Sequence, residues 1–310
     1  MCFSPDSEQI ADIAALRIWA KTGNGAAYRI TLSAPTRIGS DTVSPSAFAV
    51  FRFITKSNLV GCSTGRTACD CDLSGPERPC HTEHVRGRRQ MPLPGRVVAA
   101  PPGVHGFDAN SVLNRRSCEL AKARGFQFCV RYVSRQDVQP VGDLSEAEAN
   151  VILGAGLALM PVQHVALENW SPSQALGIRN GKNAAKHARQ IGFPEGVNVW
   201  LDLEGAKTST PHETMIAYCN AWFAEVEGAG FVPGVYVGAG AILTGNELFW
   251  RLTTQHYWKS GSRVPDIPHR GYQLIQTILR NDKIDGVAID RNLTKNDNFG
   301  GSVLWLSTSG

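Results

Sequence analysis

The feature that most constrains the fold is a regular alternation of short apolar runs with helical patterns between residues 104 and 310. Each apolar run is short enough for one strand, and Gly or Pro stands at most joints between elements. Strands that alternate with helices pair in parallel through right-handed crossovers. The predicted strands lie at 104–109, 126–133, 157–165, 197–203, 232–237, 256–258, 272–277 and 287–290.

This pattern predicts an α/β protein with a (β/α)8 barrel of the TIM type. The span of about 200 residues lies near the lower limit for such a barrel. A doubly wound sheet is the structural alternative. Polar residues at the end of nearly every strand favour the closed barrel, because a barrel gathers its strand ends on one face.

Residues 1–103 differ from the rest in composition. Residues 1–100 hold 12 Lys+Arg against 8 Asp+Glu, whereas residues 101–310 hold 19 of each, so the net charge of +4 originates in the first third. Gly, Pro, Ser and Arg are frequent from residue 57 to residue 103, which is typical of loops. We therefore expect a poorly structured extension over 1–103 and a barrel domain over 104–310. A second hypothesis is that residues 1–90 come from an over-extended gene start. Met91, before a proline-rich lead, is the alternative start.

Several functional classes are disfavoured by the same composition. A net charge of +4 is too small to argue for nucleic acid, and no apolar stretch reaches the roughly 18 residues of a membrane span. Cysteine and histidine between residues 62 and 84 follow no standard zinc-finger spacing. We expect no metal, no cofactor and a monomer. No convincing signal peptide is present, although a wall-active protein is expected outside the cell.

In a TIM-type barrel the active site is built at the carboxyl ends of the strands. The residues predicted at these ends are acids, aromatics and amides, and they include no phosphate loop and no helical His-Glu-x-x-His motif. They are Asp108, Arg131, Tyr132, Gln163, His164, Asp202, Glu204, Tyr236, Gln276 and Asp290.

The segment Trp200-Leu201-Asp202-Leu203-Glu204 carries the most chemical information. Strand alternation puts Asp202 and Glu204 on one face, with Cβ atoms roughly 6–7 Å apart. Paired carboxylates at about 5–9.5 Å act across a glycosidic bond, and their repulsion lets one hold a proton while the other is ionised. Capping or a surface salt bridge is the alternative for this pair. Neutralisation of a carboxylate is the alternative for Arg131.

Seven segments in order resemble a known family. They are GFD (106–108), F-x-x-RY, LSEAEANVILGAGL, LDLE, PGVYVG, YQLIQT and VAID. Together they resemble the glycoside-hydrolase-like domain of unknown function 1906, which is related to the family 25 glycoside hydrolases, lysozyme-type enzymes on (β/α)8 barrels. The resemblance covers about residues 103–292.

The resemblance implies roles for individual residues. Glu204 matches the proton donor and Asp202 its partner, while Asp108 and Asp290 match the acids of the first and last strands. The implied substrate is an N-acetylated β-1,4 glycan such as peptidoglycan. In these relatives the substrate's own N-acetyl group can serve as nucleophile, so retaining, inverting and substrate-assisted mechanisms stay open.

The leading hypothesis is therefore a glycosidase acting on a cell-wall polysaccharide, with general acid catalysis by Glu204 and Asp202. The expected substrate-binding residues are Asp108, Asp290, Tyr236, Arg131 and Gln276. A non-catalytic carbohydrate-binding barrel is the alternative. A barrel enzyme for a small molecule is a weaker third, since no Lys or metal cluster stands at the strand ends.

Overall fold

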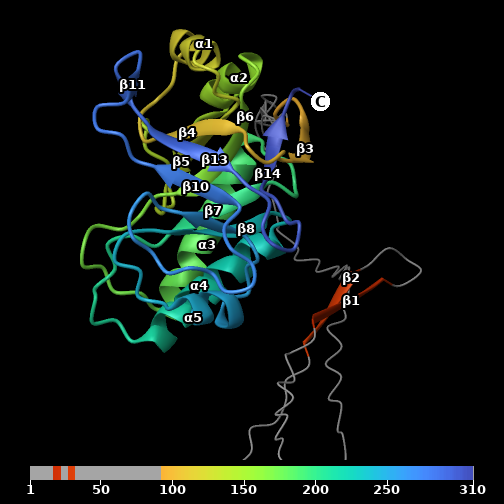
Figure 1. The fold of residues 1–310 in the computed structure, drawn as a ribbon, viewed down its shortest axis with the longest axis vertical. Coiled ribbons are helices and arrows are strands. Elements are labelled where there is room, and N and C mark those ends of the chain that lie inside the picture. Colours follow the sequence, from red (N-terminus) through yellow and green to blue (C-terminus); the bar gives the residue numbers. More distant parts are fainter. Residues whose placement is uncertain (1–16, 22–26, 32–91, 310) are drawn as a thin grey trace, which may run out of the picture. The chain divides into compact units, whose positions relative to one another are not determined.

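The computed structural model describes Arg17–Lys21, Ala27–Thr31 and residues 92–309 (Figure 1). The chain divides into two compact units, Met1–Cys80 and His81–Gly310. In the first unit, β1 (Arg17–Lys21) pairs with β2 (Ala27–Thr31) in an antiparallel ladder. Met91 and the cysteines at 62, 69, 71 and 80 lie outside the described residues.

In the second unit, eight strands close into a barrel. Each strand pairs with the next in sequence around the ring, β6 pairs with β7, and the last strand returns to the first, so the predicted barrel is confirmed. The strands in order are β4 (His105–Ala109), β5 (Phe128–Val133), β6 (Ala158–Gln163), β7 (Asn198–Asp202), β8 (Val232–Val237), β9 (Tyr257–Lys259), β10 (Leu274–Thr277) and β13 (Asp290–Thr294).

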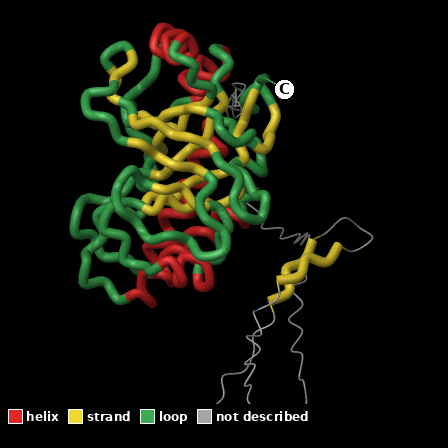
Figure 2. Tube along the Cα trace, in the orientation of Figure 1, coloured by secondary structure: helices red, strands yellow, loops and turns green. Residues whose placement is uncertain are grey.

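Helices follow the first five of these strands and lie outside them (Figure 2). They are α1 (Arg115–Ala123), α2 (Glu146–Gly154), α3 (Gln174–Ile191), α4 (His212–Gly228) and α5 (Gly245–Arg251). Side chains of Asn114, Ser145, Ser173 and Thr244 accept backbone N–H groups and so define the starts of four helices. No helix in the described part of the chain is long and apolar enough to cross a membrane.

The eighth strand differs from the prediction, which had all strands parallel. β13 runs antiparallel to both β10 and β4. The segment between β10 and β13 contains no helix that would support a parallel crossover. It forms instead a small hairpin of β11 (Lys283–Ile284) and β12 (Val287–Ala288), after which the chain enters the barrel from the opposite end.

Two further strands extend the sheet beside the barrel. β14 (Leu304–Ser307) pairs antiparallel with β3 (Arg96–Ala99) over four residue pairs and touches β6 through Leu306 and Leu159. β3 lies within the range where the sequence predicted the extension. Residues before 104 therefore pair with the barrel unit.

Strand alternation divides the apolar side chains into two layers. One set, including Val130, Met160 and Trp200, fills the inside of the barrel, and a larger set packs between the strands and the helices. Glycines make room for two large interior rings. A Cβ on Gly106 would lie 2.4 Å from the Phe128 ring, and one on Gly234 would lie 2.5 Å from the Trp200 ring.

Candidate functional site

Asp202 and Glu204 lie at the end of β7, where the strand gives way to a turn. The backbone N–H of Glu204 donates to Asp202 Oδ1 at 2.9 Å, so the turn, rather than strand alternation, holds the two residues together. The pKa of Asp202 is raised to about 8, chiefly by burial; the charges of Glu204 and Asp108 act in the same direction, and the backbone hydrogen bond from Glu204 opposes them. Asp202 therefore holds a proton at neutral pH.

The Glu204 side chain is fixed by one of its two oxygens. Oε1 accepts the backbone N–H of Ala239 at 3.0 Å and lies 3.3 Å from the Tyr236 hydroxyl oxygen. A Cβ on Gly238 would lie 1.9 Å from Glu204 Cγ, so only glycine at that position leaves room for this side chain. Oε2 has no hydrogen-bond partner among residues 92–309. It is the oxygen that remains free to meet a ligand.

Asp108, on β4, stands directly opposite Asp290 in the β4–β13 ladder. Asp290 reaches this end of the barrel as the first residue of an antiparallel strand, not as the last residue of a parallel one. Burial raises the pKa of Asp108 to about 7, although two side-chain hydrogen bonds oppose the shift. The pKa of Asp290 is raised by partial burial and then by the charges of Glu204 and Asp282.

Two buried amides bind Asp108 in fixed orientations. Gln276 Nε2 donates to Asp108 Oδ2 at 3.0 Å, and Asn292 Nδ2 donates to the same oxygen at 2.7 Å. The orientations of these two amides are fixed by hydrogen bonds to their oxygens. Tyr236 donates to Gln276 Oε1 and Trp258 Nε1 donates to Asn292 Oδ1, each at 2.8 Å. A chain of polar contacts thus runs from Asp108 through Gln276 to Tyr236, whose hydroxyl oxygen lies 3.3 Å from Glu204 Oε1.

The end of the barrel that carries Asp108, Asp202, Glu204 and Asp290 is called the mouth below. Of the predicted site residues, the structure brings these four acids together with Tyr236 and Gln276. Among the described residues, no group of three or more His, Cys, Asp or Glu has the arrangement of a metal site.

Arg131 is the predicted site residue that does not belong to the mouth. It is fully buried, and its Nε donates to Glu148 Oε1 on α2 at 2.7 Å. Its remaining nitrogens donate to the carbonyl oxygens of Ala109 and Gly142 and to Glu148 Oε2. The structure thus places Arg131 in a buried ion pair with Glu148, the neutralising role that the sequence left open for it. Alternation along β5 directs its side chain outwards, where it joins the strand to the helix.

Alternation also identifies two residues of the mouth to which the sequence assigned no substrate-binding role. Tyr132, next to Arg131, points towards the mouth, and its pKa is raised by burial and by the charges of Asp108 and Asp202. Asn292 follows Asp290 by two residues and so shares its face of β13. Strand periodicity predicts an inward direction for Tyr132. It predicts the same for Asn292 only when the last strand is extended to residue 294.

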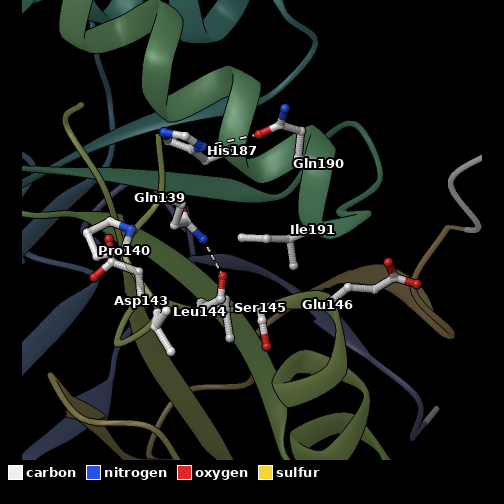
Figure 3. Close-up of a pocket in the computed structure, with 10 residues that line it drawn as sticks. Gln139, Pro140, Asp143, Leu144, Ser145, Glu146, His187, Gln190 and Ile191 are labelled. Carbon is white, nitrogen blue, oxygen red and sulfur yellow. Dashed lines mark hydrogen bonds between the residues drawn. The ribbon is translucent and has the colours of Figure 1, made fainter. Parts of the chain in front are cut away.

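A pocket lies between the loop before α2 and the helix α3 (Figure 3). Its lining includes Gln139, Asp143, His187 and Gln190. Gln139 donates to the carbonyl oxygen of Leu144, which helps to fix the loop. None of the four acids of the mouth lines this pocket.

Comparisons with known proteins place the chain in a family. Residues 119–294, more than half of the chain, match the Rv2525c-like, glycoside hydrolase-like domain. No curated protein sequence matches the chain. Solved structures with a similar fold include the Tat-secreted protein Rv2525c of Mycobacterium tuberculosis in complex with L-tartrate, with 18% identity, 64% of this chain and 98% of that chain covered, and a TM-score of 0.48.

Two lysozyme-type structures are also similar. The Streptomyces coelicolor lysozyme has 16% identity, covers 64% of this chain and 94% of its own, and has a TM-score of 0.45. The muramidase of Trichobolus zukalii has 15% identity, covers 62% and 94%, and has a TM-score of 0.43. The match over residues 119–294 shows that the chain belongs to the Rv2525c-like family of glycoside hydrolase-like domains.

Proposed function

We propose that this protein hydrolyses an N-acetylated β-1,4 glycan of the peptidoglycan type. The observation that carries the proposal is the gathering of four carboxyl groups at the mouth, two of them buried with raised pKa values. Buried acids destabilise a fold when they must ionise, and such perturbed groups concentrate where proton transfer is needed.

Glu204 is the general acid in this proposal. Its free Oε2 delivers a proton to the glycosidic oxygen while the bond between that oxygen and the sugar carbon breaks. Asp202 supports it, because Asp202 lies beside Glu204 and its own pKa is raised to about 8, so that it is protonated at neutral pH and can resupply Glu204. Water supplies the hydroxyl group to the sugar carbon, and its remaining proton returns to the pair.

Asp108 and Asp290 bind or orient the sugar and water on the other side of the mouth. Gln276 and Asn292 hold Asp108 Oδ2, so its other oxygen is the one presented to a ligand. Tyr236 belongs to the same set, since it connects Gln276 with Glu204. The substrate in this proposal is a polysaccharide, and the reaction uses side chains without a cofactor.

The deciding experiment is turbidity loss of a purified bacterial cell-wall suspension, combined with measurement of released reducing ends. We expect activity in the wild type, a loss of at least about 100-fold in Glu204→Gln, and a decline in rate above about pH 8 as Asp202 loses its proton. Glu168→Gln is the matched control, because Glu168 is an exposed glutamate on a neighbouring loop and should keep full activity.

Two outcomes would contradict the proposal. If no reducing ends are released from walls or N-acetylglucosamine oligomers between about pH 4 and pH 9, the protein is not this glycosidase. Binding of the same oligomers without any product would then favour the carbohydrate-binding barrel. Equal activity in Glu204→Gln and in Glu168→Gln would remove Glu204 from the mechanism.

A further inference from the structure

Tyr132 lies among the acids of the mouth without being held by any of them. It is the fifth residue of β5, on the face that Phe128 and Val130 direct into the barrel. The charges of Asp108, Asp202 and Glu204 all act on its phenol group. No residue of the described barrel unit accepts or donates a hydrogen bond at its hydroxyl group.

This hydroxyl keeps its proton at neutral pH. Burial and the surrounding acids raise the pKa of Tyr132 well above its usual value of 10.0. The carboxyl groups beside it gain or lose protons near neutrality. Tyr132 therefore offers a hydrogen-bond donor that does not titrate with them.

The Tyr132 ring is held by His164 from the side. The centroids of the two rings are 4.7 Å apart, with an interplanar angle of 31°. The backbone N–H of His164 donates to the carbonyl oxygen of Val133 at 3.0 Å, so the imidazole stands directly beyond the end of β6. The stacking involves the ring of Tyr132 and not its hydroxyl group.

Asp143 in turn holds His164. The imidazole Nε2 lies 2.7 Å from Asp143 Oδ1, and the Asp143 side chain is buried. The other oxygen, Asp143 Oδ2, is buried without a hydrogen-bond partner among the described residues. The Asp143 carboxyl group is therefore bonded to His164 through Oδ1. The loop returns to β5 at the same point, because the N–H of Leu144 donates to the carbonyl oxygen of Tyr132 at 2.9 Å.

We propose that Tyr132 donates a hydrogen bond to an uncharged oxygen of the bound sugar, and that His164 and Asp143 are positioning residues that hold its ring. This inference rests on the proposed glycan substrate and adds a binding residue to that same site. A tyrosine fixed by a stacked imidazole loses little rotational freedom on binding. The donor is thereby aligned before the sugar arrives.

The test is calorimetric binding of an N-acetylglucosamine tetramer, with steady-state kinetics on the same oligomer. Tyr132→Phe removes the hydroxyl group and keeps the stacked ring, so we expect binding about three- to tenfold weaker, the usual effect of one uncharged hydrogen bond. His164→Ala should weaken binding by a similar factor. The double variant Tyr132→Phe/His164→Ala should be no weaker than the weaker single variant, because both act through the same hydroxyl group.

His187→Ala is the matched control for the positioning role. His187 Nε2 lies 2.7 Å from the carbonyl oxygen of Gln136, so this imidazole anchors the same loop but does not touch Tyr132. We expect its tetramer binding to equal that of the wild type. His164→Phe keeps a ring against Tyr132 and should restore most of the affinity that His164→Ala loses.

The outcomes separate this inference from the function on which it rests. Normal tetramer binding in Tyr132→Phe would overturn the role of the hydroxyl group while leaving the glycan substrate intact. Additive losses in the double variant, or an equal loss in His187→Ala, would overturn the positioning role. A wild type that neither binds nor cleaves the tetramer or solubilised peptidoglycan would overturn the proposed function, and this inference with it.

Discussion

Asp108 makes the stability of the folded protein depend on pH. Its pKa is raised from 3.8 to about 7, so the folded protein keeps a proton that the unfolded chain releases above about pH 4. The stabilisation is fully present below that pH and is lost as the pH rises through about 7. Asp202 contributes with the same sign, up to about pH 8. Folding is therefore less favourable in mild alkali than in mild acid.

Asp108→Asn should remove much of this dependence. The amide resembles the protonated acid and can still accept from Gln276 and Asn292. We expect wild-type stability at about pH 5 and a gain on the order of 2–4 kcal/mol at about pH 9, measured by urea unfolding. Asp137→Asn is the control, because Asp137 is exposed and its pKa is lowered by Lys186. Parallel pH profiles for Asp108→Asn and the wild type would contradict the buried proton.

Single residues also show how far the sequence could predict the mouth. Asp108, Asp202 and Glu204 were found because acids at strand ends are conspicuous, whatever the detailed strand geometry. Arg131 was misplaced because two neighbouring strand residues cannot both face the mouth, and Tyr132 takes that direction. Gln163 likewise points outwards, towards Asn180 and Trp222. Whether a residue occupies an inward-facing or an outward-facing position of its strand predicted its place at the mouth better than its polar character did.

Among the elements, strands with helical crossovers were predicted well. The predicted strands at 126–133, 197–203 and 232–237 overlap β5, β7 and β8 almost completely. The last strand was predicted at 287–290, whereas β13 covers Asp290–Thr294. An antiparallel strand needs no helix before it, so no helical pattern in the sequence marked where β13 begins. Strand β14 was missed, since its pairing with β3 depends on contacts between distant parts of the chain.

The turn after β8 gives a test of how Glu204 is positioned. Gly238 follows that strand, and an added Cβ would displace the Glu204 side chain. We expect Gly238→Ala to lose on the order of 100-fold in glycan hydrolysis, because a misplacement of about 1 Å can cost that much. The fold should persist, since the obstructed atoms belong to a side chain that can move.

Gly228→Ala is the matched control for this variant. Gly228 is the last residue of α4, and no described neighbouring atom lies within 4 Å of its added Cβ. Activity should match the wild type, and the melting temperature should be equal or slightly higher, because alanine favours a helix over glycine. If Gly238→Ala were fully active, the observed position of Glu204 would have no importance for hydrolysis.

For the whole barrel unit, β3 should decide where the stable unit begins. β14 pairs with the barrel strand β6 through one residue pair, whereas β14 pairs with β3 over four residue pairs. The Trp305 ring of β14 packs against Phe128 at 5.2 Å inside the barrel. Removal of β3 would expose one edge of β14 and weaken this closure at the end opposite the mouth.

Two fragments test this boundary. We expect residues 91–310 to unfold like the second unit of the full chain, and residues 104–310 to be destabilised by on the order of 3 kcal/mol, with a melting temperature lower by about 5 °C or more. Circular dichroism during heating measures the difference. Glycan binding well below the transition should be equal in both, because β3 contributes no residue to the mouth. Equal melting temperatures would mean that the barrel closes without β3, and that the boundary at residue 104 is sufficient.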